Sequence, residues 1–337
     1  MSRLGHWSPD GSLTPAVVSR LDGHLDVDQM TSAVRASPVR RPAGENRRRS
    51  RSRGTPVPEG DTVYQAARRL HQALAGQVLS VSDFRVPRYA TVDLTGSTVL
   101  EVVPRGKHLL MRCSGGTTVH SHLRMEGAWR TFAAGEPWRG GPGWQIRVVL
   151  GNARHVAVGY RLPVLDILRT ADEPAVVGHL GPDVLGPDWD LDRVLAAALA
   201  RPESEIGMVL LDQTVLAGLG NIYRIEACFV AGVSPWTRVG EVPDLGRLVN
   251  RARQMILVNA DRPTRVTTGS ARPGEHLWVY GRGRRPCRRC GTAIRVAEQA
   301  QSDAPEEGRV TYWCPRCQRG PAPMGSPGAG GGTSIRA

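Results

Sequence analysis

Two Cys-x-x-Cys pairs near the end of the chain constrain its fold more than any other sequence feature. Cys287 and Cys290 form the first pair, and Cys314 and Cys317 form the second. Four thiolates in this arrangement suit a tetrahedral Zn²⁺ ion in a closed structural site. Redox dithiols are the alternative, but no thioredoxin-like βαβ pattern surrounds either pair. The sequence therefore predicts one structural zinc ion, and the polar stretch 298–308 predicts a lengthened hairpin tip between the pairs.

The charge balance indicates the kind of partner. The 337 residues carry a net charge of +13, which favours a polyanion, most often nucleic acid. Eight arginines crowd the cysteine pairs, at positions 282, 284, 285, 288, 289, 309, 316 and 319. We expect this segment to contact phosphate, and a solvated basic face is the alternative.

The compartment follows from the apolar pattern and from the remaining cysteines. No apolar run approaches the length of a membrane span, and the first residues contain no apolar signal core. Cys113 and Cys228 lie in apolar stretches and are predicted to be buried free thiols. A reducing, cytoplasmic compartment is therefore expected.

The chain divides into segments of different pattern. Residues 1–56 show no periodicity and end in an Arg/Ser run, which predicts a disordered basic leader. Apolar residues at helical spacing predict a helix over 61–75, with Asp61 or Thr62 as its N-cap. Short β-runs split by Gly and Pro then predict a β-sandwich or barrel. The runs cover residues 78–81, 98–103, 108–112, 117–122, 145–150 and 156–158.

The second half of the chain changes character. Residues 191–260 are rich in Leu and Ala and are predicted to be helical. The stretch 211–223 is typical of a helix, a glycine turn and a second helix, and Asn221 stands where the second helix begins. A helix start offers free N–H groups to a phosphate, although Asn221 could equally serve as an N-cap. The Gly/Pro/Ser-rich residues 320–337 are predicted to be disordered.

Lys107 is the one lysine among 44 basic side chains. A composition rich in Arg, Ala, Gly and Pro indicates a GC-rich genome, in which solvated lysines drift toward arginine. Arginine can replace a surface charge, but it cannot replace an amine that must release a proton. Lys107 is therefore a candidate functional residue, and chance is the alternative.

Four motifs, taken together and in order, carry a family resemblance. They are Pro58-Glu59-Gly60-Asp61-Thr62, Arg105-Gly106-Lys107-His108, Gly218-Leu219-Gly220-Asn221 and the four-cysteine ribbon. Residues 57–319 resemble the formamidopyrimidine-DNA glycosylase/endonuclease VIII family, most closely its actinobacterial endonuclease VIII-like branch.

The resemblance implies an α+β multidomain fold and a set of boundaries. An N-terminal catalytic β-sandwich with one leading helix would span 57–190, and a helix–two-turn–helix DNA-binding domain 191–275. A zinc-ribbon β-hairpin would span 276–319.

The resemblance also implies an activity. Such proteins excise an oxidised base and then cut the strand at the abasic site, so the expected partner is damaged DNA, bound by a monomer in the nucleoid. Oxidised pyrimidines are the expected substrates, with 8-oxoguanine or formamidopyrimidine lesions as the alternative. A non-catalytic zinc-dependent DNA-binding protein is the main competing interpretation, and a zinc-ribbon transcription component fits the β-rich first half poorly.

In this family Pro58 would be the nucleophile, which requires it to be N-terminal. Only an N-terminal proline has a free secondary amine, whereas an internal proline is a tertiary amide with no usable lone pair. Val57 precedes Pro58, and GTG encodes valine internally but methionine at a start. We therefore hypothesise that translation starts at position 57 and that residues 1–56 are absent from the mature protein. A genuine extension, which would abolish lyase chemistry, is the alternative.

The remaining family roles map onto single residues. Glu59 would protonate the departing base or the opening sugar, and Lys107 would donate a proton in β-elimination. Arg309 would contact the phosphate that flanks the lesion and would be associated with a second, δ-elimination step. Asn221 would bind the same phosphate region.

A glycosylase that flips a base also needs a wedge to fill the gap. Arg124 and Met125 are the candidates, and a core methionine at a strand end is the alternative for Met125. Thr62 stands where many relatives carry a second glutamate, so we assign no catalytic role to that position.

Overall fold

The computed structural model describes residues 57–301 and 304–323. The predicted leader, most of the predicted tail and residues 302–303 lie outside these residues. The rest of the predicted hairpin tip, 298–301 and 304–308, belongs to two strands. Within the described part of the chain, no helix is long and apolar enough to cross a bilayer.

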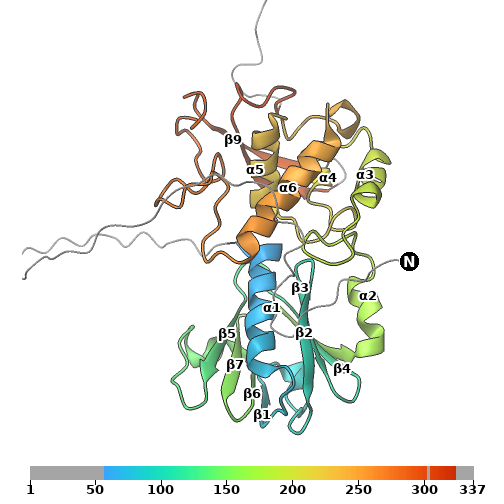
Figure 1. Cartoon of the computed structure of the whole chain (residues 1–337), viewed down its shortest axis with the longest axis vertical. Helices are drawn as coiled ribbons and strands as arrows, with labels where there is room; N and C mark the ends of the chain where they lie inside the picture. Colours follow the sequence, from blue (N-terminus) through green and yellow to red (C-terminus); the bar gives the residue numbers. More distant parts are fainter. Residues whose placement is uncertain (1–56, 302–303, 324–337) are drawn as a thin grey trace, which may run out of the picture. The chain divides into compact units, whose positions relative to one another are not determined.

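Two four-stranded antiparallel sheets and one helix form the first domain (Figure 1). The strand orders are β1-β6-β7-β5 and β2-β3-β4-β8. Helix α1 packs its apolar stripe into the same core as the inward residues of both sheets. The elements are α1 (Gly60–Leu74), β1 (Val81–Phe84), β2 (Val99–Arg105), β3 (His108–Cys113), β4 (Thr117–His122), β5 (Ala128–Ala133), β6 (Ile146–Gly151), β7 (His155–Tyr160) and β8 (Val164–Arg169). The predicted sandwich is confirmed.

Local details differ from the sequence expectations. The N-cap of α1 is Glu59, not Asp61 or Thr62, because the helix already begins at Gly60. The run 78–81 overlaps a strand only at Val81, where β1 begins, and Val78 forms an isolated bridge to Thr98. Strands β5 and β8 were not predicted, because polar residues interrupt both; one is Asp166, in the middle of β8.

The second half is helical up to Ala260. Its helices are α2 (Glu173–Val177), α3 (Leu191–Leu199), α4 (Ile206–Val209), α5 (Asn221–Ala231) and α6 (Leu245–Ala260). Helices α3 to α6 share one apolar core. The helix expected to begin near 211 is instead the short α4, which ends at Val209, and a turn-rich segment leads from it to α5. Short 3-10 helices cover Pro87–Tyr89, Gly143–Gln145, Thr170–Asp172 and Val239–Glu241.

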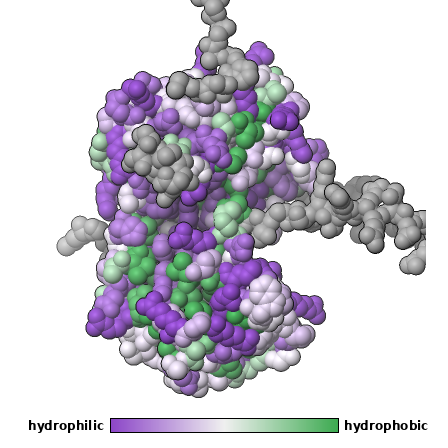
Figure 2. Space-filling model, turned by 180° about the vertical axis from the view of Figure 1, so that it is seen from behind, coloured by the Kyte–Doolittle hydropathy of each residue, from purple (hydrophilic) through white to green (hydrophobic). Residues whose placement is uncertain are grey.

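The last element is an antiparallel hairpin, β9 (Arg295–Gln301) and β10 (Ala304–Trp313). Apolar residues beside it share a small core with Ile225 and Phe229 of α5. Helix α5 therefore packs against the cysteine-bearing segment as well as against the helical core. Cys113 and Cys228 are buried free thiols, as predicted. Hydrophilic residues cover most of the face in Figure 2, with smaller hydrophobic patches between them.

Candidate active site

Glu59 is buried against the N-terminus of α5, and this contact organises the site. Its carboxylate accepts a hydrogen bond of 2.7 Å from the Ile222 N–H and a longer one of 3.5 Å from the Tyr223 N–H. A helix N-terminus stabilises a negative charge placed there. Burial nevertheless raises the pKa of Glu59, and the charges of Arg265 and Lys107 oppose that rise. The environment thus favours a carboxyl group that can hold a proton.

Glycines allow the two segments to meet this closely. The Gly60 N–H donates to the Gly218 carbonyl at 2.9 Å, and a Cβ on Gly60 would lie 2.8 Å from that oxygen. A Cβ on Gly220 would lie 2.4 Å from the Glu59 Cδ. Gly218 has a φ of +95°, which side chains rarely adopt. The glycine turn noticed in the sequence therefore seats Glu59.

Lys107 lies in the tight turn between β2 and β3. The turn is fixed from outside, because the Gly106 N–H donates to Asp183 at 2.6 Å and Arg105 pairs with Asp188 at 3.1 Å. Partial burial lowers the pKa of Lys107 to about 8; Glu59 opposes this shift, and Arg309 and Arg265 add to it. An amine with a pKa near 8 can both give and take a proton near neutral pH. This property suits the proton-transfer role predicted for Lys107, which arginine could not fill.

Asp61 and Arg265 form a buried ion pair that the sequence analysis did not identify. The Arg265 Nε and Nη2 atoms bond the two Asp61 carboxylate oxygens at 2.8 Å and 2.5 Å. The Tyr223 hydroxyl donates to the same carboxylate at 2.7 Å, and the Arg265 guanidinium stacks over the Tyr223 ring. Such a fork-to-fork pair fixes the arginine in one orientation.

Asn221 connects α5 to the hairpin. It is the first residue of α5, as predicted, but the N-cap is Gly220. Its Nδ2 atom donates to the Val310 carbonyl at 2.9 Å, and its Oδ1 atom accepts from the Arg224 Nε at 2.8 Å. The exposed Arg309 precedes Val310 on β10. The contact therefore joins the helical turn to the strand that carries Arg309.

Arg224 is fully buried and was also missed. Its two remaining nitrogens donate to Gln299 of β9 at 2.5 Å and to Thr311 of β10 at 2.6 Å. A buried guanidinium needs hydrogen-bond partners, and here each of its three nitrogens has one. No sequence pattern marks this arginine out among the 43 others of its charge class.

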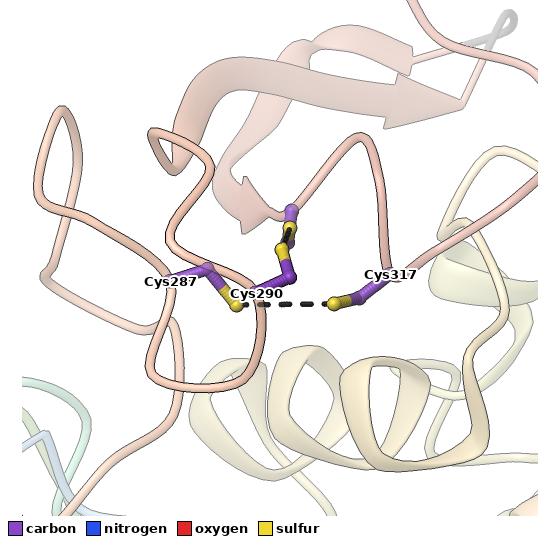
Figure 3. Close-up of side chains that lie close together, drawn as sticks. Cys287, Cys290 and Cys317 are labelled. Carbon is purple, nitrogen blue, oxygen red and sulfur yellow. Dashed lines mark hydrogen bonds between the residues drawn. The ribbon is translucent and has the colours of Figure 1, made fainter.

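The four cysteines meet as predicted. Their sulfur atoms all lie within 4.8 Å of one another, with Cys287–Cys317 at 3.9 Å and Cys290–Cys314 at 3.5 Å. In Figure 3, the labelled sulfurs of Cys287 and Cys317 face each other along a dashed line, and Cys290 lies between them. A Zn–S bond of ~2.3 Å in a tetrahedron requires sulfurs ~3.8 Å apart. The cluster could therefore hold a metal ion of this size.

Comparison with known proteins agrees with this geometry. The family model for the formamidopyrimidine-DNA glycosylase N-terminal domain matches residues 57–160, and the one for its H2TH domain matches residues 180–257. The "probable endonuclease 8 2" of Streptomyces coelicolor is 61% identical over 282 residues, covering 83% of this chain and 99% of that protein. The chain belongs to the formamidopyrimidine-DNA glycosylase/endonuclease VIII family.

Other relatives support the assignment. The "DNA-(apurinic or apyrimidinic site) lyase Nei2" of Mycolicibacterium smegmatis is 50% identical over 264 residues, covering 78% of this chain and 99% of that protein. A crystal structure of Lactococcus lactis formamidopyrimidine-DNA glycosylase, bound non-covalently to DNA containing an abasic site, has a TM-score of 0.64. It is 24% identical and covers 78% of this chain and all of that one. The family fold predicted from the sequence is confirmed.

The two wedge candidates of this family member lie in the tight turn after β4. The Gly127 N–H donates to the Leu123 carbonyl at 2.8 Å and closes the turn. Met125 at its tip is 60% exposed, so it is not a core methionine. Arg124 is exposed too and has a φ of 48°, a backbone conformation that is uncommon outside glycine. The turn presents both side chains to solvent, where DNA could reach them.

Several of the crowding arginines turn out to have internal partners. Arg282 donates to the Pro286 carbonyl at 2.8 Å, and Arg288 to the Leu277 carbonyl at 3.1 Å. The Arg289 guanidinium lies 4.6 Å from the Phe229 ring centroid. These arginines therefore stabilise the loops around the cysteine pairs, and not all eight are available to bind DNA.

Proposed function

We propose that this DNA glycosylase and AP lyase of base excision repair attacks oxidised pyrimidine nucleotides with the α-amine of Pro58. The observation that carries the proposal is the placement of Glu59. Glu59, the residue after Pro58, is buried and accepts a hydrogen bond from the first turn of α5. It is also close enough to Lys107 for their charges to interact. An acid and an amine are thereby gathered beside the proline.

The chemistry follows from these groups. The Pro58 nitrogen lone pair forms a bond to C1′, and the glycosidic bond breaks with its electron pair going to the base. Glu59 gives the proton that the departing base or the opening sugar takes up. The amine nitrogen loses its proton, and the C1′–O4′ bond then breaks with its electron pair going to O4′, which takes up a proton. The opened sugar is held as an iminium ion, which acidifies the C2′ proton. Removal of that proton expels the 3′ phosphate, and Lys107 serves as the proton donor of this elimination.

The proposal requires Pro58 to begin the mature chain. The family model starts its match at residue 57, which supports a start at that position. Removal of the initiator residue would then release the secondary amine. The preceding residues 1–56 lie outside the described structure and outside both family matches.

Phosphate contacts would hold the strand while the nucleotide leaves the helix. Arg309 is exposed on β10, next to the residue whose carbonyl binds Asn221. Two donors from two elements can grip one phosphate and fix the kinked backbone. Met125 would enter the base stack, and Arg124 would flank it. The protein would act as a monomer on chromosomal DNA in the cytoplasm.

Zinc is the metal that the cysteine cluster fits. Four thiolates at these separations suit a closed tetrahedral site, which is structural because no ligand position is left open. When bound, the ion would hold the two cysteine turns beside α5. The proposed chemistry still lies with Pro58 and Glu59, which precede α1, and with Lys107 in the β2–β3 turn.

Pyrimidine preference rests on the names of the nearer relatives. Proteins that are 48–61% identical are named endonuclease 8 or Nei2, whereas two named formamidopyrimidine-DNA glycosylase are 30% and 31% identical. A preference for 8-oxoguanine or formamidopyrimidine lesions is the second candidate.

Borohydride trapping tests the proposal. Protein that begins at Pro58 is incubated with duplexes that each contain one lesion: thymine glycol, 5-hydroxyuracil, dihydrouracil or 8-oxoguanine. A reduced protein–DNA adduct is expected on the pyrimidine lesions and on a preformed abasic site. Protein that retains Val57 is the matched control and should form none. Absence of any adduct from the Pro58-start protein would leave only a zinc-dependent DNA-binding protein, and adducts confined to 8-oxoguanine would reverse the substrate assignment.

The intact mass of natively expressed protein tests the start. A mass that begins at Pro58 is expected, and one that includes residues 1–56 would contradict the proposed processing.

A further inference from the structure

Arg265 faces the backbone at Pro58 directly. Its Nη1 atom lies 3.4 Å from the Val57 carbonyl oxygen, and this carbonyl is bonded to the Pro58 nitrogen. A chain that begins at Pro58 lacks that carbonyl and presents its amine at the same place. The Arg265 guanidinium, which the segment after α6 contributes, would then lie beside that amine.

The cation is held rigidly. Its side chain is 10% exposed, and two of its nitrogens are taken by Asp61, whose side chain is 5% exposed. Nη2 also approaches the Thr62 Oγ1 at 3.4 Å. The Tyr223 ring lies against the guanidinium, with 4.9 Å from the Arg265 Cζ to the ring centroid. Contacts with these three residues leave the guanidinium little freedom to move away from the proline.

The carboxylate of this pair belongs to the first turn of α1. Asp61 is buried there, and its neighbour Thr62 carries no charge. The carboxylate is therefore committed to Arg265 and to the Tyr223 hydroxyl.

Other titratable groups interact electrostatically with Glu59, the residue after Pro58, or with Lys107 in the β2–β3 turn. They are Asp61 on α1, Tyr223 on α5, Tyr280 before the first cysteine pair, and Arg309 on β10.

We propose that Arg265, pinned by Asp61, is a positioning residue whose fixed positive charge keeps the Pro58 amine in its unprotonated, nucleophilic form. The proposal rests on the function proposed above. An ordinary α-amino group has a pKa of about 8, so much of it is protonated at neutral pH. A neighbouring cation disfavours a second positive charge and lowers that pKa. Arg265 acts through the proline and does not itself contact the sugar.

The test is the pH profile of imine formation. Single-turnover borohydride trapping of a preformed abasic site is measured from pH 5.5 to 9 for Pro58-start protein and for Arg265→Gln. The rate rises with pH as the amine loses its proton. Removing the cation, which also leaves the Asp61 carboxylate unpaired, should move this rise upward by at least half a pH unit. Below the rise, the rate should fall threefold or more.

Three variants separate charge from structure. Arg265→Lys keeps the charge and should stay near the wild-type profile. Asp61→Asn removes the opposing negative charge and should not move the rise upward. Arg112→Gln is the matched control, because Arg112 also forms a partly buried fork with a carboxylate, that of Glu173. It should leave the midpoint of the profile unchanged.

A second readout does not depend on turnover. The amine of ¹⁵N-proline-labelled protein is titrated by NMR, and its midpoint should rise in Arg265→Gln. An unchanged NMR midpoint in that variant would overturn the role given to Arg265. A wild-type protein that titrates normally but forms no adduct would instead contradict the proposed function.

Discussion

Gly220→Ala should disable Glu59 while leaving the backbone unstrained. Gly220 has φ −126° and ψ −169°, an extended conformation that alanine adopts freely. The new Cβ, however, would lie 2.4 Å from the Glu59 Cδ and 2.8 Å from its Oε1. The carboxylate must therefore shift and lose its 2.7 Å bond from the Ile222 N–H. A hydrogen bond to a charged group contributes about 1.5–3 kcal/mol, which corresponds to a roughly 10- to 150-fold loss if the bond is needed in the transition state.

Two assays isolate this effect. Single-turnover release of an oxidised pyrimidine should fall by that factor, whereas cleavage of a preformed abasic site, which has no base to protonate, should fall less. Gly143→Ala is the matched control, since a Cβ there meets nothing within 4 Å. Circular dichroism verifies that both variants are folded. Wild-type base release from a folded Gly220→Ala protein would refute the assignment of Glu59 as the acid.

Three further results are expected. The pKa of Lys107 is lowered to about 8, so the rate of β-elimination should decline as the pH rises through that value. Lys107→Arg stays protonated and should lack this decline. An identical decline in both proteins would contradict the role of Lys107 as proton donor. Met125→Ala should change the free energy of unfolding by no more than about 0.5 kcal/mol, because the side chain is 60% exposed, yet it should lower the rate of lesion excision. Leu199→Ala is the control, because Leu199 is 54% exposed. Equal excision by the two variants would contradict the wedge role. Cys314→Ser should lower the zinc content, measured by atomic absorption, below the one ion per chain expected of the wild type, and it should lower the melting temperature. A zinc-free wild-type protein with an unchanged melting temperature would contradict a structural role for the ion.

Parts of the site could be predicted because their signals are local. The two cysteine pairs predict a four-sulfur cluster, and the glycines beside Asn221 indicate a close approach of two backbone segments. The lone Lys107 stood out against an arginine-rich background. In each case a few neighbouring residues carry the constraint. The structure brings the four sulfurs together and packs the glycine turn against Glu59 and Gly60.

Other parts depend on contacts that no local pattern records. Asp61 resembles an N-cap in the sequence, but its partner Arg265 lies 204 residues away. Arg224 looks like any helical arginine until β9 and β10 supply its acceptors. Strand β8 was missed because Asp166 breaks its apolar run, although the Tyr89 hydroxyl satisfies that carboxylate at 3.1 Å. Pairing at long range decides these positions, so a single sequence does not reveal them.

Helix α5 explains why motifs so distant in the sequence converge. Its first turn receives Glu59, and Asn221 and Arg224 reach β9 and β10 from the same turn. Its apolar face, through Ile225 and Phe229, packs against the segment that bears the cysteines. A helix resists bending over these few turns, so a displacement at the metal site would be transmitted to the residues at its start. Loss of the metal should therefore disturb base release as well as DNA affinity, even though no cysteine contacts Glu59.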